Sequence, residues 1–147
     1  MKDVKLVPFK AEHAKAFDDN EGELVYLGAT IADYMEFNES GGPGYTGIHH
    51  GKVIGCGGVR LFWKGVGEAW GIYPGCFFQN IREVFYYTKT MLGTIIEEND
   101  LRRVQATARV DLGCAQNWLR HLGFKREGRM NNYCPSGNDT YLYSILR

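Results

Sequence analysis

Apolar and polar residues recur with two different periods along this chain of 147 residues. Side chains on a strand alternate between the two faces of a sheet, whereas those on one face of a helix recur every three or four positions. The segment 45–63 predicts a hairpin, because two apolar strands flank a turn at His50–Gly51–Lys52. Alternation also predicts strands at 4–9 and 102–110, and further strands are predicted at 68–74, which Pro74 and Gly75 end, and at 124–128 and 139–147.

Helical spacing of apolar residues predicts helices at 10–19, 23–37, 80–98 and 112–122. The pattern is longest in the third of these, where it persists for about four turns. Asp111 is the predicted N-cap of the last helix, and Gly123 is the left-handed residue that ends it. Between the second helix and the hairpin, the glycine-rich segment 38–44 predicts a flexible loop.

This order of elements predicts one domain over residues 1–147, of the α/β class with an α+β mixed sheet. We expect a central sheet of about six or seven strands with helices on both faces. Strand 68–74, helix 80–98 and strand 102–110 should form a right-handed crossover between parallel strands. Because ligands of such sheets bind beyond the carboxyl ends of central strands, we expect a site after Tyr73–Pro74.

Charge and cysteine content narrow the possible functions. The 17 basic and 17 acidic residues cancel, so we expect no binding to nucleic acid or to an anionic membrane, which need a basic excess. No apolar run approaches the roughly 18 residues of a membrane span, and the first ten residues lack the apolar core of a secretory signal. The four cysteines stand singly without metal-ligand spacing, so we expect reduced thiols, no metal site and a cytoplasmic protein.

Three stretches resemble the GNAT superfamily of acyl-CoA-dependent N-acyltransferases, in the order that the family has them. "VKLVPFKAEHAKAF" is similar to the opening strand and first helix, and "HHGKVIGCGGVRLF" is similar to the hairpin. "CAQNWLRHLGFKREG" is similar to the late helix that ends in Leu–Gly–Phe and leads into a strand. The resemblance covers nearly the whole chain. It implies a GNAT-like mixed sheet and acetyl-CoA as the cofactor.

The resemblance places the pantetheine of CoA against the backbone of the strand at 68–74. The strand residues implied are Trp70, Gly71, Ile72 and Tyr73. The pyrophosphate loop of the family has Gln or Arg, two residues, Gly, one residue, then Gly or Ala, which lets the backbone approach the phosphates. Gln79 matches the first position, but Arg82 and Val84 replace the small residues. Two interpretations follow: either Gln79, Asn80 and Arg82 bind phosphate in another way, or Arg82 is a solvated surface residue.

The catalytic positions of the family are matched in part. Many members use a Tyr of the late helix to protonate the leaving thiolate, and here that position is Leu119. Tyr133, in the loop between the last two strands, is either the residue that donates this proton instead or a surface residue. Glu68 is the candidate that takes a proton from the attacking amine, or else a solvent-facing strand end. His49–His50 is interpreted as the exposed hairpin tip.

The resemblance thus implies an N-acetyltransferase that moves the acetyl group of acetyl-CoA to a primary amine by direct attack. The acceptor would be a small molecule or a protein. The altered loop and the missing Tyr leave a second hypothesis open, a GNAT-fold protein that no longer catalyses and serves as a binding or structural module. The aromatic-rich "FWKGVGEAW" and the glycine-poor loop also resemble GNAT-related bacteriophage proteins. The partners would then be phage virion proteins or a second copy in a homodimer, and the location the host cytoplasm or the virion.

Overall fold

The computed structural model describes residues 3–16, 31–73 and 81–147. The first part contains β1 (Val4–Pro8), the 3-10 helix η1 (Ala11–Ala16), α1 (Ile31–Gly41), β2 (Gly44–His49), β3 (Lys52–Trp63) and β4 (Val66–Ile72). The second contains α2 (Ile81–Glu98), β5 (Arg103–Arg109), α3 (Gly113–His121), β6 (Lys125–Met130) and β7 (Thr140–Leu146). Each strand predicted from the sequence is therefore confirmed, with small shifts at its ends.

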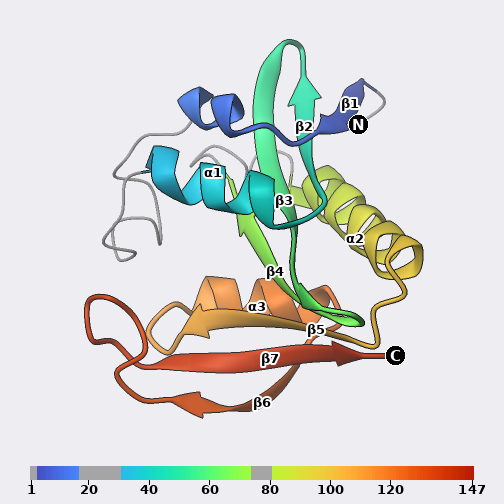
Figure 1. Cartoon of the computed structure of the whole chain (residues 1–147). Coiled ribbons are helices and arrows are strands. Elements are labelled where there is room, and N and C mark those ends of the chain that lie inside the picture. The colour runs from blue at the N-terminus through green and yellow to red at the C-terminus, as the bar shows by residue number, and fades with distance from the viewer. Residues whose placement is uncertain (1–2, 17–30, 74–80) are drawn as a thin grey trace.

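The strands form one mixed sheet of seven, in the order β1-β2-β3-β4-β5-β7-β6. Neighbouring strands are antiparallel except β4 and β5, which run parallel and are connected through α2 (Figure 1). The predicted parallel pair is confirmed. The β2–β3 hairpin turns at His50 and Gly51, whose φ angles of 49° and 75° place both in the left-handed region that such turns require.

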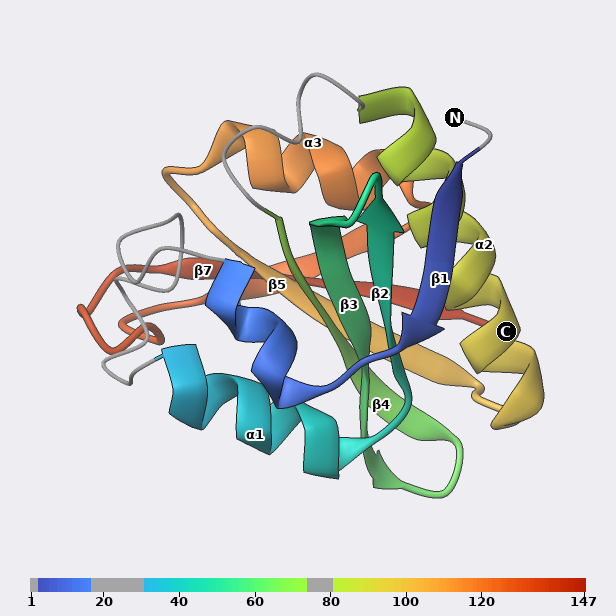
Figure 2. The same cartoon turned by 90° about the horizontal axis from the view of Figure 1, so that it is seen from above.

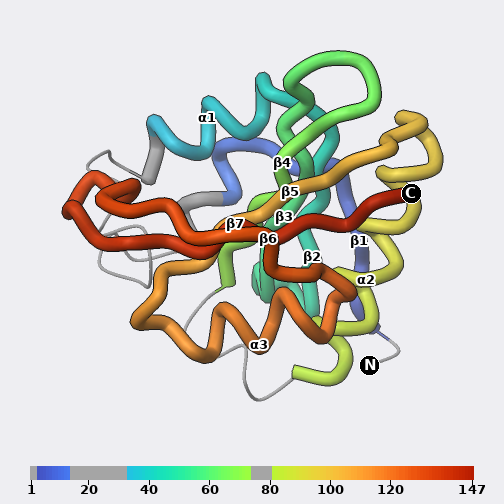
Figure 3. Tube along the Cα trace, turned by 90° about the horizontal axis from the view of Figure 1, so that it is seen from below, coloured from blue at the N-terminus to red at the C-terminus, as the bar shows by residue number. Residues whose placement is uncertain are grey.

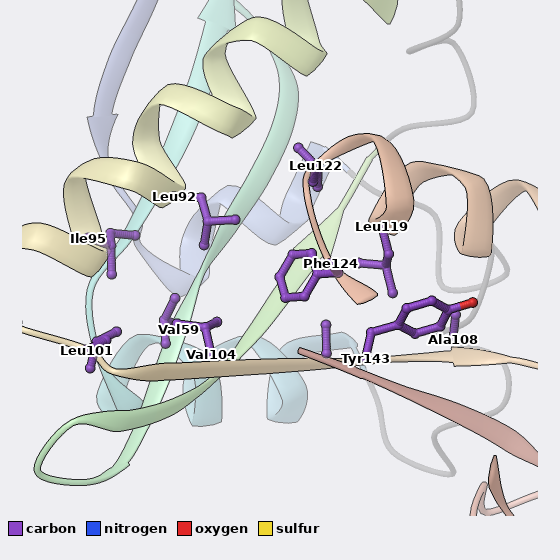
Figure 4. Close-up of a cluster of buried hydrophobic side chains, with 11 residues drawn as sticks. Val59, Leu92, Ile95, Leu101, Val104, Ala108, Leu119, Leu122, Phe124 and Tyr143 are labelled. Carbon is purple, nitrogen blue, oxygen red and sulfur yellow. The ribbon is translucent and has the colours of Figure 1, made fainter. Parts of the chain in front are cut away.

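Helices cover both faces of the sheet, as the sequence predicts. We call the side of η1 and α1 the α1 face, and the opposite side the α2–α3 face (Figures 1 and 2). The view from below likewise shows α1 and α3 on opposite sides of the strands (Figure 3). The larger hydrophobic core lies on the α2–α3 face, where its side chains converge from the sheet and both helices (Figure 4). A smaller core on the α1 face consists of Phe9, Met35, Cys56, Trp70 and Ile72.

The helix before the hairpin ends later than predicted. α1 continues to Gly41, so the prediction of a flexible loop from residue 38 is wrong for 38–41. Asn38 is fully buried, and its Oδ1 accepts a hydrogen bond from Arg60. The hydroxyl of Ser40 donates to the carbonyl oxygens of Glu36 and Phe37. The tertiary contact between Asn38 and Arg60, together with the local bonds of Ser40, outweighs the low helix propensity of this segment.

The start of α3 also differs from prediction. Its N-cap is Leu112, without a side-chain hydrogen bond, so Asp111 is not the cap. The Asp111 carboxylate accepts a hydrogen bond from Nε of Arg109 at 2.9 Å instead, and this contact lowers the pKa of Asp111. The ion pair thus engages the carboxylate that would otherwise cap the helix.

The remaining helix predictions are confirmed as far as the structure describes them. Gly123 ends α3 with a φ of 104°, in the left-handed region. The helix expected at 10–19 is a 3-10 helix over Ala11–Ala16. The rest of that segment, and residues 23–30 of the second helix, lie outside the described residues.

An ion pair across the C-terminal strands makes stability depend on pH. The Arg103 guanidinium on β5 donates to both oxygens of Glu127 on β6, at 2.9 and 2.6 Å. Hydrogen bonds from Arg103 lower the pKa of Glu127 from about 4.5 to about 2. Because the folded-state pKa lies below the unfolded one, this stabilisation is complete above about pH 4.5 and is lost as the pH falls toward about 2.

We therefore expect the free energy of unfolding to fall more steeply with acidification in the wild type than in Glu127→Gln. The two proteins should converge below about pH 2, where Glu127 becomes protonated in the folded as well as the unfolded state. Urea unfolding followed by circular dichroism across this range measures the difference. Parallel pH profiles would show that the ion pair contributes nothing to stability.

Candidate functional site

β4 and β5 separate near the centre of the sheet. They pair at three positions, Val66 with Arg103, Gly67 with Val104 and Glu68 with Gln105. Beyond Glu68, β4 continues along β3 to Ile72, while β5 continues along β7 to Arg109 (Figure 1). Within the described part of the chain, the edge of β4 that faces β5 therefore has no strand partner after Glu68.

A cavity of about 1040 Å³ opens at this divergence. Tyr34, Arg60 and Glu68 line it on the α1 face, and Ala115 and Trp118 line it on the α2–α3 face. Its lining thus reaches from one face of the sheet to the other through the gap between β4 and β5. A volume of this size is typical of sites for elongated organic ligands.

Glu68 lies where the two strands part, and its carboxylate is held from both sides. Oε1 accepts a hydrogen bond from Nη2 of Arg60 on β3 at 2.8 Å, and Oε2 accepts one from Nε2 of Gln105 on β5 at 3.0 Å. The Glu68 side chain is only 13% exposed. A carboxylate offers about four lone-pair sites. Each oxygen of Glu68 can therefore still accept one more hydrogen bond, for example from an amine.

Arg60 is surrounded by groups of β4 and α1. Its Nη1 donates to Oδ1 of Asn38 at 2.5 Å, and the guanidinium lies 5.8 Å and 5.5 Å from the ring centres of Tyr34 and Phe37. Burial works to lower the pKa of Arg60, but its contacts with Tyr34 and Glu68 outweigh burial and raise it. Arg60 thus stays charged and neutralises Glu68 inside the protein.

Tyr133 lies in the β6–β7 loop and lines the same cavity as Glu68. Partial burial raises the pKa of Tyr133, and the negative charge of Glu68 raises it further. Both effects keep the phenol protonated near neutral pH. The structure therefore brings the two predicted catalytic residues to one cavity, while their roles stay predictions.

Three aromatic residues meet on the α2–α3 face. Trp118 contacts Tyr73 and Phe85 edge-on, at ring-centre distances of 5.4 and 5.8 Å. The hydroxyl of Tyr73 lies 3.2 Å from Oγ1 of Thr88, and burial raises the pKa of Tyr73. A Cβ on Gly55 would meet the Tyr73 ring at 2.7 Å, so the glycine makes room for this ring. Leu119, where the resemblance implies a catalytic Tyr, belongs to the core.

The predicted cofactor residues that the structure describes all line the cavity. Trp70 and Ile72 are buried and pack in the core of the α1 face, whereas Gly71 is exposed. Arg82 is exposed in the first turn of α2 and also lines the cavity. Gln79 and Asn80 lie outside the described residues. His49–His50 is at the hairpin tip, as expected, and is not among the lining residues.

The sequence analysis missed the groups that hold Glu68. Arg60 stands directly opposite Glu68 in the antiparallel β3–β4 register. A hairpin joining 45–63 to 68–74 through the turn at Lys64–Gly65 would have suggested this pair. Gln105 and Asn38 carry no comparable signal, because they reach the site through contacts between distant segments.

The described residues do not meet the requirements of a metal site or of a membrane-spanning helix. Among residues 3–16, 31–73 and 81–147, His, Cys, Asp and Glu form no cluster that could hold a metal ion. No helix in these segments is long and apolar enough to cross a bilayer.

Comparison with known proteins gives structural but no sequence relatives. The chain matches no family model and no curated protein sequence. A GNAT-family acetyltransferase from Bacillus anthracis has a TM-score of 0.76 and 17% identity, covering 97% of this chain and 94% of that one. A mutant of SpeG spermidine N-acetyltransferase from Vibrio cholerae has a TM-score of 0.77 and 13% identity, with coverage of 99% and 95%. Ribosomal-protein-S5-alanine acetyltransferase from Vibrio fischeri has a TM-score of 0.75 and 14% identity. The match covers 99% of this chain and 94% of that one. At such low identities the likeness establishes the fold.

Proposed function

We propose that this chain, whose fold is that of the GNAT acetyltransferases, transfers an acetyl group from acetyl-CoA to a primary amine by direct attack. The observation that carries the proposal is the cavity between β4 and β5, whose lining spans both faces of the sheet. A two-substrate reaction needs such an arrangement, because the acyl donor and the amine can approach the same carbonyl carbon from opposite sides.

The residues present fit acetyl-CoA in three respects. The edge of β4 beyond Glu68 leaves backbone groups for the amides of pantetheine, and Gly71 on this stretch has no side chain to block them. The cavity volume suits an elongated chain. Arg82, at the start of α2, offers a guanidinium that can pair with phosphate oxygens near a helix N-terminus.

In the proposed reaction the amine nitrogen forms a bond to the thioester carbonyl carbon as the carbon–sulfur bond breaks. Glu68 accepts a hydrogen bond from the nitrogen and stabilises the positive charge that develops there. The proton released by the nitrogen passes to water, and the thiolate takes one proton in exchange. Tyr133 remains the proposed donor of that proton.

Charge reversal of Arg82 tests the cofactor site. We expect Arg82→Glu to weaken acetyl-CoA binding by roughly 10-fold or more, because a carboxylate would replace a cation near the phosphates. Calorimetric titration with acetyl-CoA, CoA and 3′-dephospho-CoA measures the affinities. Lys89→Glu is the matched control, since Lys89 is exposed on the same helix but does not line the cavity. Equal affinities in both variants would place the phosphates elsewhere.

A second candidate function is a GNAT-fold protein that binds partners without catalysis, such as a phage virion-associated protein. One observation favours it: Leu119, at the position of the family's catalytic Tyr, is only 9% exposed and packs in the core. The same titration separates the two candidates. Saturable acetyl-CoA binding supports the enzyme, whereas no binding at millimolar ligand favours the non-catalytic module.

A further inference from the structure

On the α1 face, where Glu68 would meet the amine and which we call the acceptor end, the cavity contains a cation of the protein itself. The Arg60 guanidinium has a carboxylate at 2.8 Å, an amide oxygen at 2.5 Å and two aromatic rings within 6 Å. These are the groups by which proteins recognise organic cations. Because Arg60 already neutralises them, they hold no excess negative charge for a further ammonium group of a ligand beyond its reacting amine.

The charged residues that line the cavity also disfavour an acceptor with a second charged group. Among the described lining residues, Glu68 is the only acidic side chain, and it is paired with Arg60. The other permanently charged lining residue, Arg82, is a cation at the start of α2. The part of the lining that the structure describes therefore offers no unpaired carboxylate to a second ammonium group. It also offers no unpaired cation at the acceptor end to a carboxylate.

Both kinds of charged acceptor would be costly to bind here. Taking an ion out of water without a partner of opposite charge is strongly unfavourable. Besides the Tyr34 ring that Arg60 contacts, the aromatic lining residues Trp70 and Tyr133 provide apolar surface instead. An acceptor that is uncharged apart from its reacting amine would bury its apolar part against these rings.

We propose that the acceptor is a monoamine with an apolar or aromatic body, and that Arg60 determines this specificity by neutralising Glu68. The inference rests on the proposed acetyl transfer and names its substrate class. Arg60 acts on the substrate through Glu68, so it is a specificity-determining and positioning residue rather than a catalytic one.

Three acceptors of similar length test the proposal. Hexylamine carries only the reacting amine, hexamethylenediamine adds a second ammonium group, and ε-aminocaproate adds a carboxylate. For the wild type with acetyl-CoA, we expect kcat/KM for hexylamine to exceed that for each charged analogue by roughly 10-fold or more. A wild type that uses the diamine or the amino acid as well as hexylamine would overturn the proposal.

Two variants separate the effect of charge from that of structure. Arg60→Gln can still donate a hydrogen bond but leaves the Glu68 carboxylate unpaired, so kcat/KM for the diamine should rise relative to hexylamine by roughly 10-fold. Arg60→Lys keeps the charge and should keep the preference of the wild type. A folded Arg60→Gln protein, checked by circular dichroism, with an unchanged ratio would exclude Arg60 as the determinant. If that variant does not fold, the wild-type comparison decides alone.

Direct binding distinguishes failure of this inference from failure of the proposed function. Saturation-transfer NMR with the wild-type protein detects binding of the three acceptors without any turnover. Absence of acetyl-CoA binding would reject the enzyme, yet preferential binding of hexylamine would still support the acceptor class. Equal binding of all three compounds would overturn it, whether or not acetyl transfer occurs.

Discussion

Replacing Glu68 with glutamine is expected to lower the turnover number for amine acetylation by about 100-fold, the lower end of what a positioned acid–base group contributes. The amide has no charge to stabilise the nitrogen as it becomes positive, and it offers only one acceptor oxygen. The affinity for acetyl-CoA should remain nearly unchanged, because Glu68 lies on the α1 face, away from Arg82. Steady-state kinetics together with calorimetric titration measure the two effects separately.

The matched control is Glu127→Gln, the same chemical change in an ion pair that does not line the cavity. Its turnover should equal that of the wild type. Glu68→Gln also leaves the buried charge of Arg60 without its carboxylate, so thermal unfolding must show that the variant is folded at the assay temperature. A folded variant with wild-type turnover would remove Glu68 from the mechanism.

Replacing Gly58 with alanine is expected to destabilise the protein by about 3 kcal/mol or more. Gly58 lies opposite Gly44 in the β2–β3 ladder, and the amide of its neighbour Val59 donates to the carbonyl of Pro43. A Cβ at Gly58 would clash with that carbonyl oxygen and would lie 2.7 Å from Cα of Gly44. The atoms in the way belong to the backbone, so the strands themselves would have to move.

Gly93→Ala provides a control of opposite sign. Gly93 is in α2, and a Cβ there would meet no atom within 4 Å. Alanine is favoured over glycine in a helix interior by roughly 0.5–1 kcal/mol, so this variant should be slightly more stable than the wild type. Urea unfolding of both variants measures the difference. A Gly58→Ala protein as stable as the wild type would mean that β2 and β3 separate at this point at little cost.

Much of the fold follows from local periodicity. The apolar stripe of α2 predicted its length and its buried face, because Val84, Leu92 and Ile95 recur at helical spacing and pack on the sheet. The hairpin turn followed from the glycine at position 51, which adopts a φ that other residues avoid. Both features depend on residues within a few positions of each other.

The candidate site follows from the sequence only in part. Glu68 was predicted from the resemblance, which implies a Glu on this strand, but its hydrogen bond with Gln105 depends on the register of two parallel strands that are 37 residues apart at this point. Asn38 was assigned to a loop because the segment 38–44 is rich in glycine, although it lies in a helix, where the guanidinium of Arg60 donates to its Oδ1. Hydrogen-bond partners decide the environment of such residues, and no local pattern encodes those partners.

The short pairing of β4 with β5 divides the sheet into two parts, each formed by one continuous segment of the chain. β1 to β4 come from one continuous stretch of sequence, Val4–Ile72, and β5 to β7 come from another, Arg103–Leu146. Two consecutive segments therefore form two subsheets, joined through three residue pairs and through the core on the α2–α3 face. A ligand bound in the gap would contact both segments and act as an additional non-covalent cross-link. Its occupancy and the association of the two subsheets would then be thermodynamically coupled, so that each would favour the other.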